Sequence, residues 1–180
     1  HVRAKGRDTI PEQGPAVLVC NHVSYVDALI IAGCIRRPVR FVMYYKIYNL
    51  PILNFVFRTA KAISIAGKYE DESRLKKAFD DIDAALADGD LVCLFPEGKL
   101  TADGEMRVFR DGIEKIIERR TVPVIPMALK GLWGSAFSRH QSNIIYRVYR
   151  GFRSCVGLVV GDMIGHDQVS AKKLQLDVQG

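Results

Sequence analysis

Residues 16–34 read AVLVCNHVSYVDALIIAGC: a short apolar run, a polar turn and a second apolar run. Gly14 and Pro15 precede the first run, so Ala16–Cys20 is predicted to be a buried strand. The second run, Asp27–Cys34, is predicted to be a helix that begins with an acid, which the helix dipole favours. A strand, a turn and a helix in succession indicate an α/β fold, with the polar turn at the carboxyl end of a strand.

The same alternation continues along the chain, and the first residues also have a strand pattern. Further strands are predicted at Val39–Met43, Ala62–Ile65, Asp90–Phe95, Val122–Leu129, Ile144–Tyr149 and Cys155–Val160. Further helices are predicted at Leu50–Phe57, Asp71–Asp88, Gly112–Arg120 and Ser170–Val178. Two prolines place the strand at 122–129 at an edge or a bend. We therefore predict one domain over residues 1–180, an α/β sandwich in which helices flank a mostly parallel central sheet.

The helix predicted at Asp71–Asp88 has the clearest period. Its apolar residues recur at spacings of four, three and four, which places them on one face; they are Leu75, Phe79, Ile82 and Leu86. Gly89 follows as a stop signal.

Composition narrows the classes of function. Lys and Arg number 26 against 20 Asp and Glu, and the formal net charge of +6 suits an anionic partner such as a phosphate headgroup, an acidic carrier protein or a membrane surface. No nucleic-acid-binding motif accompanies the charge, so a nucleic-acid partner is not predicted. No apolar run reaches the roughly 18 residues of a transmembrane helix. The four cysteines lack CxxC spacing, so no metal site is predicted.

The polar turn, Asn21–Asp27 (NHVSYVD), contains a base and an acid five residues apart. With His22 in the turn and Asp27 in the first helical turn, the chain can fold the carboxylate back onto the imidazole. Such an acid fixes the tautomer and stabilises the imidazolium that forms when the histidine takes a proton. A turn histidine without chemistry, and an acid that only complements the helix dipole, are the alternatives. The backbone N–H groups of Val23 and Ser24 are candidates for stabilising an oxyanion.

A second polar loop, Phe95-Pro96-Glu97-Gly98-Lys99, follows the apolar strand at 90–95. Glu97 is predicted either to hydrogen-bond a substrate hydroxyl or to brace the loop. Gly98 would permit a positive φ or a close approach of the backbone, and Lys99 would meet a phosphate. An ordinary turn punctuated by proline and glycine is the alternative.

These motifs, in this order and at these separations, resemble those of the glycerolipid acyltransferase superfamily, which includes 1-acylglycerol-3-phosphate acyltransferases. His22 to Asp27 resembles the NHxxxxD signature, Phe95–Gly98 the FPEG block, and Val122–Pro126 the later proline-containing block. The resemblance implies a glycerol-3-phosphate acyltransferase-like fold and an enzyme in which His22 is the general base and Asp27 orients it. It implies no cofactor beyond the acyl thioester co-substrate.

Three longer stretches, FPEGKLTADGE, FRDGIEKI and PMALKGLWGSAFSR, are similar to the acyltransferase domain of bifunctional 2-acylglycerophosphoethanolamine acyltransferase/acyl-carrier-protein synthetases. This similarity implies acyl transfer to a lysophospholipid, lysophosphatidylethanolamine in particular, from an acyl-carrier-protein or CoA thioester. It also implies a membrane-associated location at the cytoplasmic face of the inner membrane, either peripheral or through fused domains. In that group the domain is fused to a ligase domain. Because the chain starts at His1 and opens directly on a strand pattern, we expect a domain excised from a longer chain.

The chain departs from the superfamily pattern where phosphate is bound. Residues 63–67 (ISIAG) occupy the place of an IPIDR-like run, so Gly67 stands where an arginine that binds glycerol phosphate is expected. The predicted substitute cations are Arg58, Lys61 and Lys68. After the FPEG block, Lys99 and Leu100 replace the usual Thr or Ser and Arg. We expect recognition of a phosphodiester headgroup, which carries less charge than a phosphate monoester, with 1-acylglycerol-3-phosphate as the alternative acceptor.

Two readings compete with the histidine mechanism. Cys20 would share a face with His22 if the strand continued, which would allow a thiol nucleophile. A lipid-binding module without turnover is the second reading. Its basis is a predicted membrane-surface patch that comprises Arg36, Arg37, Arg40, Tyr44, Tyr45, Tyr48 and the apolar segment 47–57.

Overall fold

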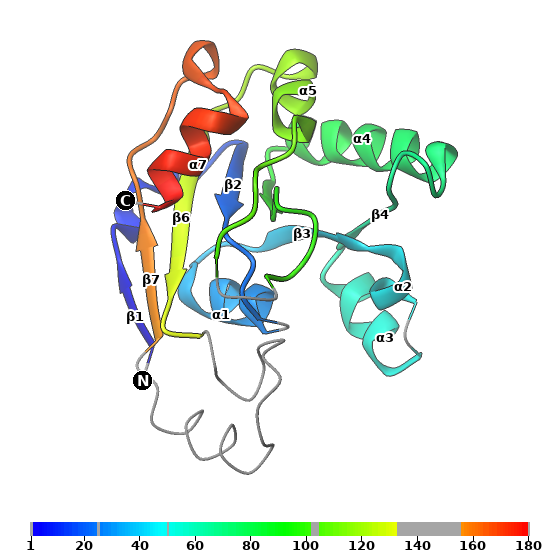
Figure 1. Ribbon diagram of the computed structural model, residues 1–180, viewed down its shortest axis with the longest axis horizontal. Helices are drawn as coiled ribbons and strands as arrows, with labels where there is room; N and C mark the ends of the chain where they lie inside the picture. Colours follow the sequence, from blue (N-terminus) through cyan, green and yellow to red (C-terminus); the bar gives the residue numbers. More distant parts are fainter. Residues whose placement is uncertain (1, 25, 50, 102–104, 133–155, 180) are drawn as a thin grey trace.

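The computed structural model of the chain describes residues 2–24, 26–49, 51–101, 105–132 and 156–179. A seven-stranded sheet with the order β1-β7-β6-β2-β5-β3-β4 forms its centre (Figure 1). The strands are β1 (Val2–Lys5), β2 (Ala16–Cys20), β3 (Val39–Tyr44), β4 (Ile63–Ile65), β5 (Leu91–Leu94), β6 (Val124–Lys130) and β7 (Val156–Val160). The five strands from β6 to β4 are parallel, whereas β7 is antiparallel to β6 and β1 is parallel to β7. The prediction of a mostly parallel sheet is confirmed.

Helices cover both faces of the sheet. They are α1 (Asp27–Cys34), α2 (Tyr45–Tyr48), α3 (Pro51–Thr59), α4 (Glu72–Ala87), α5 (Gly112–Arg119) and α7 (Ala171–Gln179), with 3-10 turns η1 (Arg7–Thr9) and η2 (His166–Gln168). One apolar cluster joins α4, α5 and α7 to the sheet through residues such as Val17 and Val19. A second cluster joins α1 to the opposite face through residues such as Leu18 and Ile31. Since side chains alternate along a strand, fully buried β2 supplies both cores.

Helix α4 begins and ends where its sequence signals place it. The side chain of Asp71 accepts a hydrogen bond from the backbone of the first turn, so it is the N-cap. Gly89 follows the last turn with a φ of 83°, the left-handed conformation that glycine adopts without a Cβ penalty. Ile82 and Leu86 of the predicted apolar face are buried in the core. The predicted helix is thus confirmed.

Strand β6 lies between β2 and β7, so of the two alternatives predicted for 122–129, an edge or a bend, the edge is wrong. The ladder with β7 begins where Met127 pairs with Val160. An isolated bridge pairs Val124 with Ile164 on the other side of Pro126. The missing N–H of Pro126 falls in the gap between this bridge and the ladder, so proline is tolerated inside the sheet without a free edge.

Segments from the two ends of the chain meet at the β1 edge. The first strand, β1, pairs with β7, and the two lie side by side in Figure 1. The strand predicted at 155–160 and the helix predicted at 170–178 are found as β7 and α7. The strand predicted at Ile144–Tyr149 lies outside the described residues. Among the helices that the structure describes, α4 is the longest with 16 residues, and none has the length and apolar character to span a bilayer.

Arg37 joins three segments at the amino ends of the parallel strands. Its guanidinium donates hydrogen bonds to the carbonyl oxygens of Pro11, Gly14 and Gly89, at 2.7, 2.9 and 2.9 Å. Gly14 lies just before β2 and Gly89 just before β5. The half-buried guanidinium of Arg37 thereby ties together the end of the sheet opposite to the loops that follow the strands.

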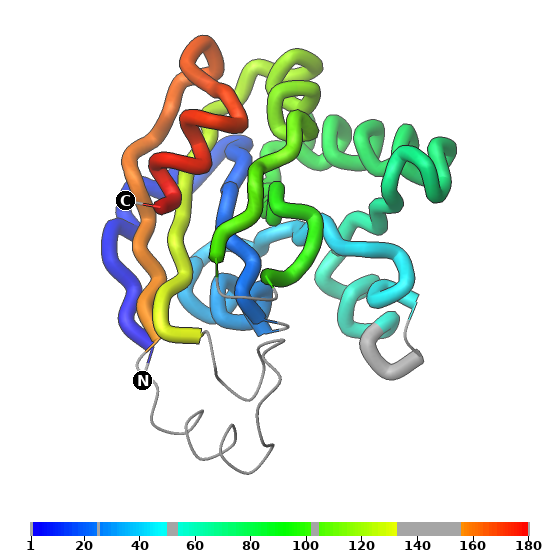
Figure 2. The backbone as a smooth tube through the Cα atoms, in the orientation of Figure 1, coloured from blue at the N-terminus to red at the C-terminus, as the bar shows by residue number. Residues whose placement is uncertain are grey.

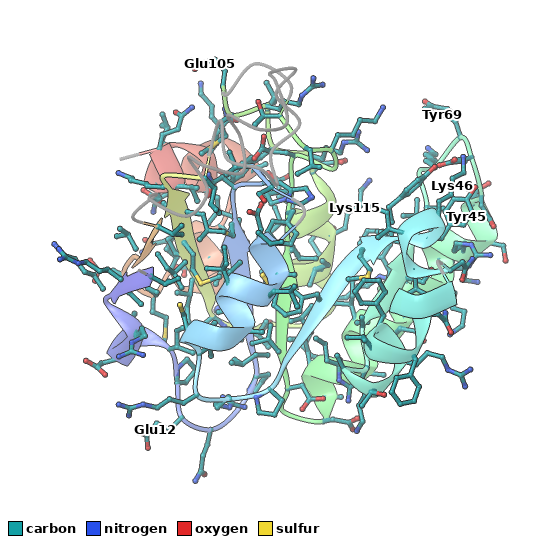
Figure 3. The ribbon with its side chains drawn as sticks, turned by 90° about the horizontal axis from the view of Figure 1, so that it is seen from below. Glu12, Tyr45, Lys46, Tyr69, Glu105 and Lys115 are labelled. Atoms are coloured by element: carbon teal, nitrogen blue, oxygen red, sulfur yellow. The ribbon has the colours of Figure 1, made fainter. Side chains whose placement is uncertain are left out.

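The predicted membrane-surface patch is divided between the two ends of β3. Arg36 and Arg37 precede the strand, and Arg40 pairs with Asp90 near its beginning. The tyrosines lie at its carboxyl end, where Figure 3 shows Tyr45 and Lys46 together. There the hydroxyls of both Tyr44 and Tyr45, and the ammonium of Lys46, contact the carboxylate of Glu70. The arginines and tyrosines therefore do not form one surface.

Candidate active site

The catalytic pair predicted from sequence is in contact. His22 lies in the turn after β2, and Asp27 is the first residue of α1. The distance from His22 Nδ1 to Asp27 Oδ2 is 2.9 Å; the carboxylate is fully buried, whereas 23% of the histidine side chain is exposed. The ring of Phe95 stacks on the imidazole with centroids 4.4 Å apart. With its Nδ1 proton donated to Asp27, the imidazole presents Nε2 as a proton acceptor.

Asp27 also holds the turn itself. Its Oδ2 accepts hydrogen bonds from the backbone N–H groups of Val23 and Ser24, at 2.7 and 2.9 Å. Three donors therefore converge on one buried oxygen, while Oδ1 is buried without a hydrogen-bond partner among the described residues. The expectation that Val23 and Ser24 stabilise an oxyanion is wrong, because both N–H groups are already bound to the carboxylate.

Glu97 contacts the same turn from the loop after β5. Its side chain is 4% exposed, and Oε1 accepts a hydrogen bond from the backbone N–H of His22 at 2.7 Å. Oε2 accepts one from the backbone N–H of Arg107 at 2.9 Å. Burial raises the pKa of Glu97 above its ordinary value, and the two N–H donors oppose that change. Of the two roles predicted for Glu97, these contacts show bracing; a contact with a substrate hydroxyl stays a prediction.

Gly98 has the predicted positive φ, 69°. A Cβ at this position would lie 2.8 Å from Cζ of Arg110, so the glycine also provides space for a guanidinium. The segment 105–111 runs back beside the loop after β5, as Figure 2 shows, and Arg110 N–H donates to Pro96 O at 3.0 Å. Lys99 is exposed. Leu100 is buried and cannot substitute for an exposed arginine.

The other predicted cations are separated by β4. Lys68 follows the strand, and its charge contributes to a lowered pKa of Asp111, although the hydrogen bond from Lys115 is the largest cause. Arg58 and Lys61 precede the strand and are exposed. Lys61 has a φ of 51°, in the left-handed region, where α3 turns into β4. Substrate binding by Arg58, Lys61, Lys68 and Lys99 stays a prediction.

Two contacts of this site were not predicted. The backbone of Arg107 holds Glu97, and the side chain of Arg110 covers Gly98. The FRDGIEKI stretch includes Arg110, but neither charge nor spacing indicates that the chain returns to Gly98 at this residue. The only signal in the sequence was that glycine itself, whose missing side chain permits a close approach.

The alternative thiol nucleophile is disfavoured by its surroundings. Cys20 is fully buried, and burial raises its pKa well above the ordinary value, so the thiol stays protonated. Cys20 belongs to the core cluster on the α1 face. Among the described residues, no three His, Cys, Asp or Glu side chains are grouped so that they could hold a metal ion.

Known proteins match this chain over most of its length. The acyltransferase family model matches residues 1–130. A 1-acyl-sn-glycerol-3-phosphate acyltransferase of Chlamydomonas reinhardtii is 28% identical over 127 residues, 70% of this chain and 37% of the relative. A lyso-ornithine lipid O-acyltransferase of Rhizobium meliloti is 30% identical over 103 residues, 57% of this chain and 34% of the relative. The chain thus spans between about a third and a half of the length of such relatives.

A solved structure shares the fold. The 1-acyl-sn-glycerophosphate acyltransferase of Thermotoga maritima superposes with a TM-score of 0.77 at 20% identity, over 99% of this chain and 69% of that one. The predicted glycerol-3-phosphate acyltransferase-like α/β fold is confirmed. Since the family model covers the histidine turn, the FPEG loop and the strand β6 together, the chain belongs to the acyltransferase family.

Proposed function

We propose that the protein transfers a fatty-acyl group from a thioester to the free hydroxyl of a lysophospholipid. One observation carries the proposal: His22 Nδ1 lies 2.9 Å from a fully buried Asp27, while the imidazole remains partly exposed. A buried carboxylate on Nδ1 and an accessible ring are what a general base needs. Membership of the acyltransferase family supports the reaction type.

In the proposed reaction, Nε2 of His22 removes the proton from the acceptor hydroxyl. The hydroxyl oxygen attacks the thioester carbonyl carbon, a C–O bond forms, and the C–S bond breaks. The imidazolium returns its proton to the departing thiolate, so the products are an ester and a free thiol. General-base assistance of this kind contributes roughly 10²–10⁴ in rate.

We favour lysophosphatidylethanolamine as the acceptor and an acyl-carrier-protein or CoA thioester as the donor. The support is the likeness of FPEGKLTADGE and FRDGIEKI to the bifunctional acyltransferase/synthetase group, and glycine at position 67 in place of arginine. Lysophosphatidic acid is the second candidate, because relatives carry the name 1-acyl-sn-glycerol-3-phosphate acyltransferase. The net charge of +6 suits an acidic carrier protein as well as a phosphate-bearing lipid.

The acceptor lipid has to be reached from a membrane. On α3, Phe55 and Val56 are exposed by 76% and 46%, which supports peripheral contact with a lipid surface. We place this contact at the cytoplasmic face of the inner membrane. A lipid-binding module without turnover would use the same exposed side chains, so binding alone does not separate it from an enzyme.

Replacement of His22 by alanine tests the function. Purified parent and His22→Ala are incubated with each pairing of lysophosphatidylethanolamine or lysophosphatidic acid with acyl-carrier-protein or CoA donors. We expect the variant to lose at least about 10²-fold in rate and to keep its binding to liposomes. His166→Ala, at an exposed histidine in η2, is the matched control and should keep parent activity.

The panel separates the candidates. Turnover by His22→Ala at the parent rate contradicts the proposed base. Liposome binding without turnover by the parent favours the lipid-binding module. A preference of the parent for lysophosphatidic acid over lysophosphatidylethanolamine selects the second acceptor.

A further inference from the structure

We propose that the guanidinium of Arg110 binds the phosphate of the acceptor lipid, in the role that Gly67 leaves without an arginine. The inference rests on the proposed function, because it names the residue that holds the headgroup beside the catalytic turn.

The backbone that carries Arg110 is fixed on both sides. Its own N–H donates to Pro96 O at 3.0 Å. The preceding residue, Phe109, is buried with 4% exposure, and its N–H donates to Oε1 of Gln175 on α7 at 3.1 Å. The side chain therefore starts from a defined point at the carboxyl end of β5, where ligand-binding loops of parallel sheets gather.

The guanidinium lies on Gly98. Cζ, Nε and Nη1 of Arg110 are 2.8, 2.9 and 3.2 Å from the position that a Cβ of residue 98 would take. The neighbouring Glu97 accepts the backbone N–H of His22. Glu97 directly precedes Gly98, so the residue under the guanidinium is the chain neighbour of the carboxylate that holds the catalytic turn.

The donors of Arg110 are free to bind a ligand. Within the described ranges, its guanidinium has no hydrogen bond and no ion pair, whereas Arg74, Arg119 and Arg120 are paired with aspartates. The carboxylates that adjoin Gly98 and Arg110 in the chain are already engaged: Glu97 accepts two backbone N–H groups, and Asp111 pairs with Lys115. A planar guanidinium with open donors matches two phosphate oxygens at once.

A second cation approaches from the loop that replaces the IPIDR-like run. Lys68 is close enough to Asp111 to help lower its pKa, after the larger effect of Lys115. Asp111 directly follows Arg110 in the chain. Lys68 therefore approaches the same region from the β4 side, where it can share the charge of a bound phosphate.

Arg110→Gln is the primary test, assayed with a lysophospholipid and with a monoacylglycerol of the same acyl chain, which lacks phosphate. We expect KM for the lysophospholipid to rise roughly 10- to 100-fold, because this is the change in affinity that corresponds to the loss of a hydrogen bond to a charged group. Turnover of the monoacylglycerol should not change. Arg110→Lys keeps the charge but lacks the paired donors, so its KM for the lysophospholipid should lie between those of the parent and Arg110→Gln. The exposed Arg3, on β1, gives the matched control Arg3→Gln.

An equilibrium titration with sn-glycerol 3-phosphate gives a readout that does not depend on turnover. If the parent transfers acyl groups but Arg110→Gln leaves KM and the preference for phosphate unchanged, the inference is wrong and the proposed function stands. A rise in KM for acyl-CoA alone also overturns it, because the phosphate would then be the donor's. If the parent acylates nothing, the proposed function fails; weaker glycerol-phosphate binding by Arg110→Gln still supports the subsite, and equal binding overturns it.

Discussion

Two buried carboxylates hold His22, the proposed general base, and they do so through different atoms. Asp27 binds the imidazole at Nδ1, whereas Glu97 binds the backbone N–H of the same residue. Asp27 is local to the turn and also closes it, while Glu97 comes from the loop after β5, 75 residues after His22 in the chain. The first contact sets the tautomer and the orientation of the ring. The second sets where the turn lies relative to the loop after β5.

The energetics of the two carboxylates also differ. Asp27 receives three N–H donors on one oxygen. Glu97 receives one on each oxygen, yet the effect of burial on its pKa exceeds that of the two bonds. The charged form of Glu97 is therefore less favourable in the folded protein than in water. This is expected for a carboxylate that is buried to position a loop.

The sharpest separation of the two roles is expected from Asp27→Asn. An amide retains an acceptor for the backbone of the turn but cannot stabilise the imidazolium, so kcat should fall about 10³- to 10⁴-fold. KM should change little, since no substrate contact is removed. Steady-state kinetics on Asp27→Asn and on the exposed-site control Asp162→Asn measure this effect. Parent-like kcat in Asp27→Asn would mean that the carboxylate only closes the turn.

A smaller loss of activity, with a pH signature, is expected from Glu97→Gln. One of the two backbone N–H groups loses its acceptor, which should cost about 1–3 kcal/mol of stability. The catalytic turn is then less well positioned, so kcat should fall about 10- to 100-fold.

The sign of the pH effect follows from the raised pKa of Glu97. The folded protein binds this proton more tightly than the unfolded chain, so the free energy of unfolding falls as pH rises from the ordinary glutamate pKa through the raised one. Glutamine has no proton to lose, and the stability advantage of the parent over Glu97→Gln should shrink as pH increases through that window. Urea unfolding at a series of pH values tests this; a constant difference would show that Glu97 titrates normally.

The smallest effect is expected from Cys20→Ser. If the two carboxylates position a histidine base, removal of the buried thiol should leave kcat within about twofold, although the added hydroxyl in the core should cost about 1–3 kcal/mol in stability. If a folded Cys20→Ser loses turnover, the alternative mechanism holds: the two carboxylates would position a histidine that activates the Cys20 thiol.

The parts of the fold and site that sequence could predict are local. Helix α4 follows from its period and its stop at Gly89, and the contact of His22 with Asp27 follows from a turn of five residues. Both depend on neighbours in the chain, whose geometry residue types constrain strongly.

The remainder depends on partners far apart in the chain. Pro126 suggested an edge or a bend. The structure accommodates this proline in a gap in the pairing of β6 with the segment that contains β7, and such a gap depends on both segments together. The backbone N–H groups of Val23 and Ser24, predicted as oxyanion donors, donate to the carboxylate of Asp27 instead. The sequence shows which donors are present but not which acceptor each of them binds. To predict the contact of Arg110 with Gly98, one would have to know how the chain returns to the loop after β5.

The three-carbonyl contact of Arg37 has a consequence for how this chain can change. It ties together the amino ends of the strands, at the end of the sheet where none of the proposed chemistry takes place. Residues in the loops at the opposite end can then be replaced with little loss of stability in the sheet. Positions 67 and 100, which differ from the superfamily pattern, lie in these loops. Libraries that seek new headgroup preferences should therefore vary the loops after β4 and β5 and leave Arg37 untouched.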